Sequence, residues 1–239
     1  MTAEPARLWV TRAQPQAAAT ARRIEALGLM AVVQPVLAVV PIEADLDLSG
    51  ADALAFTSQA AVAAFAAQSE ARALRAFPVG TATAAALRAA GFPRVEAPPP
   101  QGDVHGLAKS IATADSRPRL VFNPTAEEPA ADLGALLADS GIEVRSTPVY
   151  RTVRTHLAAP PEPIDGFLIH SAKAAAAVAD VVLPEAAGRL TAYVISEAAA
   201  AGLRQRGFGR ILLAERPEEA SLLELIERDR TRPRKPGDP

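Results

Sequence analysis

Short runs of apolar residues alternate along this chain with longer, alanine-rich stretches. The short runs predict strands, and the longer stretches predict helices, several of which stop at a glycine. Because strand and helix follow each other repeatedly, we expect parallel sheets covered by helices and joined by right-handed crossovers. The expected strands are 8–11, 31–33, 53–57, 77–79, a short one from Val95, 120–122, 143–145, 166–170, 192–195 and 211–213.

Two further segments, 36–42 and 149–153, are expected to be extended without belonging to a strand–helix pair. Pro35 and Pro41 bracket the first of them and argue against a helix there. The expected helices are 14–27, 60–67, 82–90, 107–114, 130–139, 173–180, 198–206 and 221–228.

The chain also repeats itself. Residues 79–92 and 195–208 are identical at seven of fourteen positions, and four of those seven do not involve alanine. We label this pair C and C′. A second pair, B and B′, lies upstream at 52–58 and 165–171. A third, looser pair, A and A′, lies further upstream: WVTR with a helix ending at 26–28, and VFNP with a helix ending at 139–141. The resulting order, A-B-C followed by A′-B′-C′, predicts two copies of one α/β unit.

The repeat alone leaves the domain boundary open. A plain tandem divides near residue 118. Alternatively, the extended segments 36–42 and 147–154 pair as a two-stranded connector. In that arrangement the chain leaves one domain after A and returns to it after A′, so that each domain mixes the two copies.

Composition and charge exclude several classes of function and kinds of site. The 239 residues suffice for two domains of about 110 residues each. A net charge of −2 and a pI near 6.0 disfavour general nucleic-acid or anionic-membrane binding. The absence of cysteine excludes disulfides, thiolate metal sites and a cysteine nucleophile. Arginine outnumbers lysine 22 to 3, which, like the alanine excess, we attribute to base composition.

Hydroxyl residues recur where a predicted strand meets a predicted helix. The free N–H groups and the positive dipole end of a helix favour an anion there, and open α/β sheets bind ligands at this edge. The alternative is that these side chains are ordinary helix N-caps. The candidate binding residues are Thr11, Arg12, Thr57, Ser58, Gln59, Gly80, Thr81, Thr83, Ser171, Ala172, Lys173 and Ser196.

Other candidates stand alone. Tyr150, on the second extended segment, is either a packing residue or a donor aimed at a ligand. Arg12 can bind a substrate carboxylate bidentately. Asp52 and Asp165, which precede strands, are expected to be turn residues. His170 ends a strand and could face the same edge as the hydroxyl residues.

Four motifs follow one another along the chain: LWVTRAQPQAAATARRIEALGL, DALAFTSQAAVAAF, PVGTATAAALRAAGF and PVYRT, the last before a second strand that ends in serine. Their order and spacing resemble the uroporphyrinogen-III synthase family, from about residue 7 to residue 226. The resemblance implies two flavodoxin-like parallel-sheet α/β domains joined by a two-stranded antiparallel connector. The implied bounds are 1–35 plus 155–230 for domain 1, 43–146 for domain 2, 36–42 and 147–154 for the connector strands, and 231–239 for a flexible tail.

The resemblance also implies an activity. The family is a cofactor-independent hydro-lyase of haem biosynthesis that cyclises hydroxymethylbilane, a linear tetrapyrrole with eight carboxylates. The ring A hydroxyl leaves, ring D is inverted, and the macrocycle closes with loss of water through an azafulvene cation and a spiro intermediate. By resemblance, Tyr150 matches the tyrosine that helps the hydroxyl leave, and Thr57, Ser58, Thr83 and Ser171 match hydroxyl positions lining the substrate site.

The chain departs from the family pattern at three positions. Ala199 and Ala60 stand where relatives carry a threonine and a basic residue, and Ser196 stands in the place of a glycine. These changes affect contacts made by the side chains, but not contacts made by the backbone.

We expect a cytoplasmic protein, because no secretory signal or membrane-length apolar run is visible. We also expect a monomer. The expected partners are the tetrapyrrole and, in a transient handover, the enzyme that precedes this one, with no cofactor, metal, nucleic acid or membrane. On the residues alone two other classes stay open: a non-catalytic two-domain protein that binds a small polyanionic ligand, and a two-domain glycosyltransferase.

Overall fold

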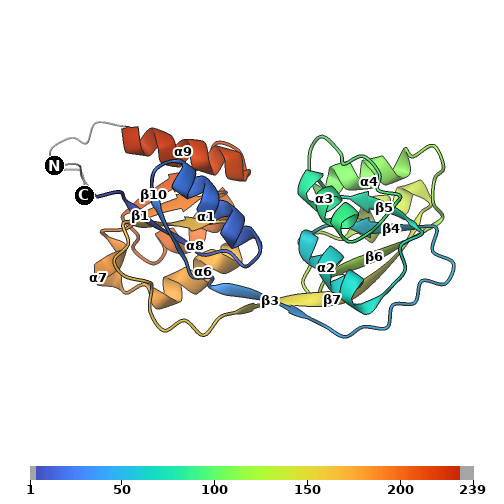
Figure 1. The fold of residues 1–239 in the computed structure, drawn as a ribbon, viewed down its shortest axis with the longest axis horizontal. Helices are drawn as coiled ribbons and strands as arrows, with labels where there is room; N and C mark the ends of the chain where they lie inside the picture. The colour runs from blue at the N-terminus through green and yellow to red at the C-terminus, as the bar shows by residue number, and fades with distance from the viewer. Residues whose placement is uncertain (1–3, 232–239) are drawn as a thin grey trace. The chain divides into compact units, whose positions relative to one another are not determined.

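The chain crosses twice between two structural units (Figure 1). The computed structural model describes residues 4–231, of which one unit takes 4–38 and 153–231 and the other takes 39–152. The first crossing falls within β3 (Leu37–Pro41) and the second within β7 (Glu143–Arg154). Apart from Thr231, the predicted tail at 231–239 lies outside the described residues.

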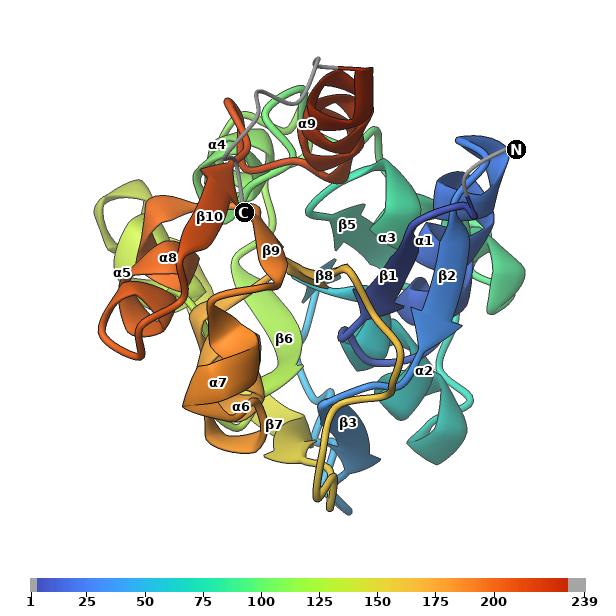
Figure 2. The same ribbon diagram turned by 90° about the vertical axis from the view of Figure 1, so that its left-hand side faces the viewer.

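Unit 1 (4–38 and 153–231) contains a five-stranded sheet in the order β10-β9-β8-β1-β2, whose strands are labelled in Figure 2. Every neighbouring pair in this sheet is parallel. The strands are β1 (Arg7–Val10), β2 (Met30–Val33), β8 (Gly166–Ile169), β9 (Thr191–Val194) and β10 (Arg210–Leu213).

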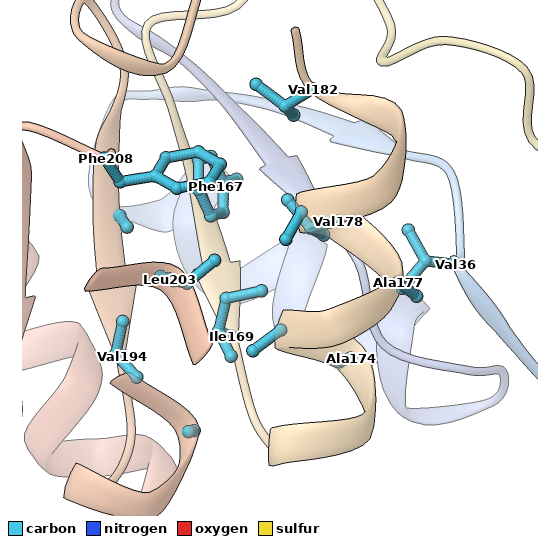
Figure 3. Close-up of a cluster of buried hydrophobic side chains, with 14 of the residues drawn as sticks. Val36, Phe167, Ile169, Ala174, Ala177, Val178, Val182, Val194, Leu203 and Phe208 are labelled. Carbon is cyan, nitrogen blue, oxygen red and sulfur yellow. The ribbon is translucent and has the colours of Figure 1, made fainter. Parts of the chain in front are cut away.

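Helices cover both faces of the unit 1 sheet. Alternate residues of β8 point to opposite faces: Phe167 and Ile169 join the buried cluster under α6 and α8, whereas Leu168 joins the cluster under α1 and α9. Figure 3 shows the first cluster, in which Phe167 packs edge-on against Phe208 with ring centroids 5.5 Å apart. The helices are α1 (Gln16–Ala26), α6 (Ala172–Val181), α7 (Pro184–Ala187), α8 (Glu197–Arg204) and α9 (Glu219–Thr231).

Unit 2 (39–152) contains a second five-stranded sheet, in the order β3-β7-β6-β4-β5. The pairs β4–β5, β4–β6 and β6–β7 are parallel. Next to β3, the N–H of Ile42 donates to the carbonyl of Val149 in β7 at 2.9 Å. The remaining strands are β4 (Ala53–Phe56), β5 (Arg75–Pro78) and β6 (Leu120–Ala126).

The unit 2 core also lies on both faces of its sheet. One cluster is aromatic and packs Phe56, Phe65, Phe92 and Phe122 together with ring centroids 5.6–6.3 Å apart. The other face buries Phe77 among aliphatic side chains of α4 and α5. The helices are α2 (Gln59–Gln68), α3 (Thr81–Ala89), α4 (Val104–Ala112), α5 (Leu133–Leu137) and a 3₁₀ turn, η1 (Ala138–Ser140).

The predicted α/β class is therefore confirmed, and the differences are local. The strand expected at Val95 is a single bridge to Ala76. The segments expected separately at 143–145 and 149–153 form one strand, β7, because its pairing with β6 continues to Tyr150. The helix expected over 130–139 is shortened to five residues plus the 3₁₀ turn, since Asp132 caps it late by accepting the N–H groups of Gly134 and Ala135.

Two aspartates at equivalent positions, one in each unit, hold neighbouring strands of their own sheet together. The Asp52 carboxylate precedes β4 and accepts the backbone N–H of Arg119 at 2.7 Å, at the start of β6. The Asp165 carboxylate precedes β8 and accepts the N–H of Arg7 at 2.7 Å, at the start of β1. The bonds from Arg119 and Leu120 are the main reason that the pKa of Asp52 is lowered. Both residues precede strands, but neither lies in a hydrogen-bonded turn as expected, and each carboxylate instead joins its strand to the next one in the sheet.

Gly166 provides a test of the unit 1 packing. A Cβ at this position would lie 2.5 Å from the carbonyl oxygen of Thr191, so Gly166→Ala must push β8 and β9 apart. We expect it to lower the free energy of unfolding by about 2 kcal/mol or more. The only tryptophan, Trp9, is fully buried in unit 1, so its fluorescence during urea denaturation reports on this unit.

The matched control is Gly202→Ala, an exposed position within α8 where an added Cβ meets nothing within 4 Å. This change should raise stability by about 0.5–1 kcal/mol, because alanine is the better helix former. Equal denaturation midpoints for the two variants would contradict the packing described for Gly166.

Candidate active site

In each unit, candidate site residues lie at the carboxyl ends of the parallel strands, where helices begin. Ser58, Ser171 and Ser196 each precede a helix, and each Oγ accepts a backbone N–H three residues on, from Ala61 at 3.0 Å, Ala174 at 3.1 Å and Ala199 at 3.4 Å. The N-cap alternative is thus confirmed for these three serines. All three remain half-buried, so a hydroxyl that caps its helix can also contact a ligand.

The remaining candidates in unit 2 fall into exposed and buried groups. Gly80 caps α3 with extended backbone, and Thr81 behind it is exposed. Thr83, in contrast, is buried within the first turn of α3. Thr57 and Gln59 flank Ser58 and are half-buried. Gly80 and Thr81 are therefore more accessible than Thr83.

Tyr150 and Ser58 meet at this edge of unit 2. Their hydroxyl oxygens lie 3.0 Å apart, although the residues are 92 positions apart in the sequence. Thr57 and Tyr150 line a cavity of about 450 Å³ within the same unit. The other residues lining it are Val79, Asp103, Val104, Thr125, Ala126, Glu128, Pro129, Ala130, Ala131 and Thr152.

The geometry of this pair defines what it can do. Because Ser58 Oγ already accepts the N–H of Ala61, its own proton is free to be donated to the Tyr150 oxygen. The Tyr150 proton can then be donated toward the cavity. A phenolate left on Tyr150 would keep the Ser58 hydrogen bond and lie near the positive end of α2. The arrangement suits a proton donor to an oxygen leaving group.

In unit 1, the side chains of Thr11 and Arg12 are both bonded to other groups of the protein. Thr11 is fully buried, and its hydroxyl donates to the carbonyl of Leu168 at 2.5 Å. Arg12 Nη1 lies 3.3 Å from a carboxylate oxygen of Glu219, the first residue of α9. Burial lowers the pKa of Arg12, while Glu219 counteracts that shift. Arg12 therefore binds a carboxylate of the protein itself, a pairing across 207 positions that no local pattern could indicate.

The other unit 1 candidates remain accessible. Ala172 and Lys173 are exposed in the first turn of α6, directly after Ser171. Ser196 opens α8 and is half-buried, followed by exposed Glu197. Ala199, one of the departures from the family pattern, is fully buried, and its backbone N–H is the group that Ser196 caps.

His170 directly follows β8 and lies near Arg12 and Glu219. Neither of its buried ring nitrogens has a hydrogen-bond partner among the described residues. Burial lowers the pKa of His170 to about 4, with a further contribution from the Arg12 charge, partly offset by Glu219. The imidazole is therefore neutral near pH 7.

The described part of the chain, residues 4–231, contains no group of three His, Asp or Glu side chains placed to hold a metal ion. None of its helices is long and apolar enough to cross a bilayer.

These features define an α/β protein of two units in which hydroxyls and helix N-termini gather at the carboxyl ends of parallel strands. The chain belongs to the uroporphyrinogen-III synthase family, because the family model described as "Uroporphyrinogen-III synthase HemD" matches residues 18–224. The resemblance seen in the sequence motifs is thereby confirmed. No match is found among curated protein sequences.

Solved structures agree with the fold. The chain is similar to uroporphyrinogen-III synthetase from Helicobacter pylori, with 20% identity, a TM-score of 0.66, and coverage of 93% of this chain and 98% of that one. It is also similar to a mutant uroporphyrinogen III synthase from Thermus thermophilus, with 18% identity, a TM-score of 0.51, and coverage of 93% and 98%. At these identities the likeness supports the fold alone.

The buried histidine predicts a pH dependence. Between about pH 6.5 and pH 4 the unfolded chain binds a proton on His170 that the folded chain does not, so stability falls as the pH falls. Replacing it with phenylalanine removes the titrating group and two unpartnered nitrogens. We expect His170→Phe to be neutral or stabilising at pH 7.

From pH 7 to pH 4, the variant should lose about 3 kcal/mol less unfolding free energy than the natural chain. Urea denaturation at both pH values, followed by Trp9 fluorescence, measures the difference. Parallel pH profiles for the two proteins would show that His170 is not buried as described.

Proposed function

We propose that this protein is a uroporphyrinogen-III synthase, a carbon–oxygen lyase that converts hydroxymethylbilane to uroporphyrinogen III with inversion of ring D and release of water. The observation that carries the proposal is the Tyr150–Ser58 hydroxyl pair beside a cavity, within the stretch that the family model matches. No metal or organic cofactor is required, because the electron-rich pyrroles of the substrate drive the departure of the hydroxyl.

Tyr150 assists the first step. As the ring A carbon–oxygen bond breaks, the Tyr150 proton passes to the departing oxygen, which leaves as water. The pyrrole nitrogen supplies the electron pair, and ring A becomes the azafulvene cation. The Tyr150 phenolate is stabilised by the Ser58 hydroxyl, 3.0 Å away, and by the N-terminus of α2. Ring D attack through the spiro intermediate later releases a proton, which restores the tyrosine.

Helix N-termini bind the substrate carboxylates in this proposal. Each helix start carries a partial positive charge of roughly half an elementary charge and several free N–H groups. Residues 57–59 and 80–83 in unit 2, and 171–173 and Ser196 in unit 1, present such starts at strand ends. This mode of binding explains how a chain with a net charge of −2 can take a highly anionic substrate.

We propose, further, that each unit is a flavodoxin-like domain and that β3 and β7 form an antiparallel connector between residues 36–42 and 147–154. Two hydrogen bonds support the antiparallel direction: Ile42 N–H to Val149 O, at 2.9 Å, and Thr155 N–H to Val36 O, at 3.0 Å. Residue numbers rise on one strand as they fall on the other. The domains proposed are 1–35 with 155–230, and 43–146.

We also propose a cytoplasmic monomer that receives its substrate by transient handover from the preceding enzyme. This part of the proposal rests on the family to which the chain belongs. A non-catalytic protein that binds small polyanions is the alternative, and the product assay separates the two.

The activity itself is tested with purified protein and fresh hydroxymethylbilane. We expect the type III isomer to predominate over the type I isomer that forms without a catalyst, measured by chromatography of the oxidised products. Type I isomer alone would exclude the synthase activity, and saturable binding without turnover would favour the non-catalytic alternative.

The role of Tyr150 is tested by Tyr150→Phe, which removes the proton donor and retains the ring. We expect kcat to fall at least about tenfold, below the ~10²-fold usual for a general acid because the substrate supplies much of the driving force. Tyr193→Phe is the matched control, because Tyr193 is the only other tyrosine and its hydroxyl donates to Asp229 at 2.8 Å. Equal kcat values for the two variants would remove Tyr150 from the mechanism.

A further inference from the structure

Four arginines surround a pocket at the opposite edge of the unit 2 sheet. The pocket has a volume of about 310 Å³ and is lined by Arg75, Arg94, Arg117 and Arg119, with Asp52 as the only carboxylate among the described residues that line it. Arg75 is the first residue of β5, and Asp52 and Arg119 immediately precede β4 and β6. The pocket therefore lies at the amino ends of these strands, whereas Thr57 and Ser58 follow the carboxyl end of β4.

The single carboxylate does not neutralise this pocket. Asp52 accepts the backbone N–H groups of Arg119 at 2.7 Å and Leu120 at 3.2 Å. Its closest approach to a lining guanidinium is 3.9 Å, to Nε of the exposed Arg119 side chain. Asp52 thus serves mainly to join the starts of β4 and β6. With Glu96, which pairs with Arg75 from outside the lining, also counted, the pocket keeps an excess of two positive charges.

One of the guanidiniums is already held in place. Arg75 Nε donates to Glu96 at 2.8 Å, Nη1 donates to the carbonyl of Ser116 at 2.6 Å, and the group lies over the Phe77 ring at 5.1 Å. These contacts involve Nε and Nη1, and Nη2 has no hydrogen bond to the described residues. A fixed guanidinium loses little conformational freedom when an anion binds.

Two of the other arginines have no acidic partner. In the described part of the chain, neither Arg94 nor Arg117 forms an ion pair with a carboxylate. Arg117 makes one long hydrogen bond, 3.4 Å, to the carbonyl of Ser140. Both side chains are exposed, so each guanidinium is accessible to an anion in the pocket.

The equivalent edge of unit 1 shows that the repeated fold does not require such a cluster. There a pocket of about 380 Å³ lies at the start of β8, β9 and β10. Its two arginines, Arg189 and Arg210, are matched by two carboxylates, Glu162 and Asp165. Arg210 also forms an ion pair with Asp229. The uncompensated charge is thus a property of unit 2 and not of unit 1.

We propose that the unit 2 pocket is a second ligand site, which binds a compact, multiply charged oxyanion of a small molecule: either a phosphate group or two or more clustered carboxylates. Guanidinium groups suit both chemistries because they form paired N–H···O bonds. The β4 strand, of four residues, places this site roughly 13 Å from the hydroxyl edge, at about 3.3 Å per residue. The site is therefore separate from the proposed catalytic one.

The test is calorimetric titration of the full chain with inorganic phosphate and, separately, with citrate, both at constant ionic strength with chloride as the background anion. We expect at least one of them to bind with a Kd of about 1 mM or tighter. The tighter probe identifies the chemistry as phosphate or polycarboxylate. Absence of heat from both probes up to about twenty times that concentration would overturn the proposal.

The variant Arg94→Gln with Arg117→Gln should weaken binding at least tenfold. The control, Arg88→Gln with Arg151→Gln, removes two positive charges from exposed positions elsewhere in unit 2 and should bind like the natural chain. Equal weakening in both would show a general charge effect and refute a site. The first variant should also retain product formation, and its loss would refute the separateness of the two sites.

Discussion

Parallel strands bring all their carboxyl ends to one edge of a sheet, and each helix that follows must begin at that edge. The first turn of a helix has N–H groups without partners inside the helix, so the edge requires acceptors. Ser58, Ser171 and Ser196 each satisfy one such group and leave the others available. The proposed carboxylate-binding function follows from this requirement, since an anion supplies the acceptors that the protein does not.

The same constraint explains the distribution of charge. An edge made of helix N-termini needs few basic side chains, which agrees with an overall charge of −2. Arg12, which the sequence suggests as a substrate ligand, is instead held by Glu219. The largest uncompensated positive cluster described above lies at the opposite edge, around Arg94 and Arg117, where no helix begins.

Local patterns predicted much of the fold, because apolar runs and glycine stops are local signals. Apart from α7 and the single bridge at Val95, they predicted helix and strand order, the paired motifs and the hydroxyl residues at the strand ends. They could not predict contacts between distant positions. The Tyr150–Ser58 bond spans 92 positions, and the continuity of β7 depends on its pairing with β6. Burial could not be predicted either. Thr11, Thr83 and Thr57 occupy similar places in the sequence pattern, yet Thr11 and Thr83 are buried.

Backbone amide chemical shifts during titration with uroporphyrinogen III, kept under anaerobic conditions, test the central claim most directly. If helix N-termini bind the carboxylates, amides in the first turns of α2, α3, α6 and α8 should shift together and with one common Kd. Shifts restricted to the amino ends of the strands, around residues 75, 94 and 117, would contradict the claim. So would a titration that leaves all four helix starts unchanged.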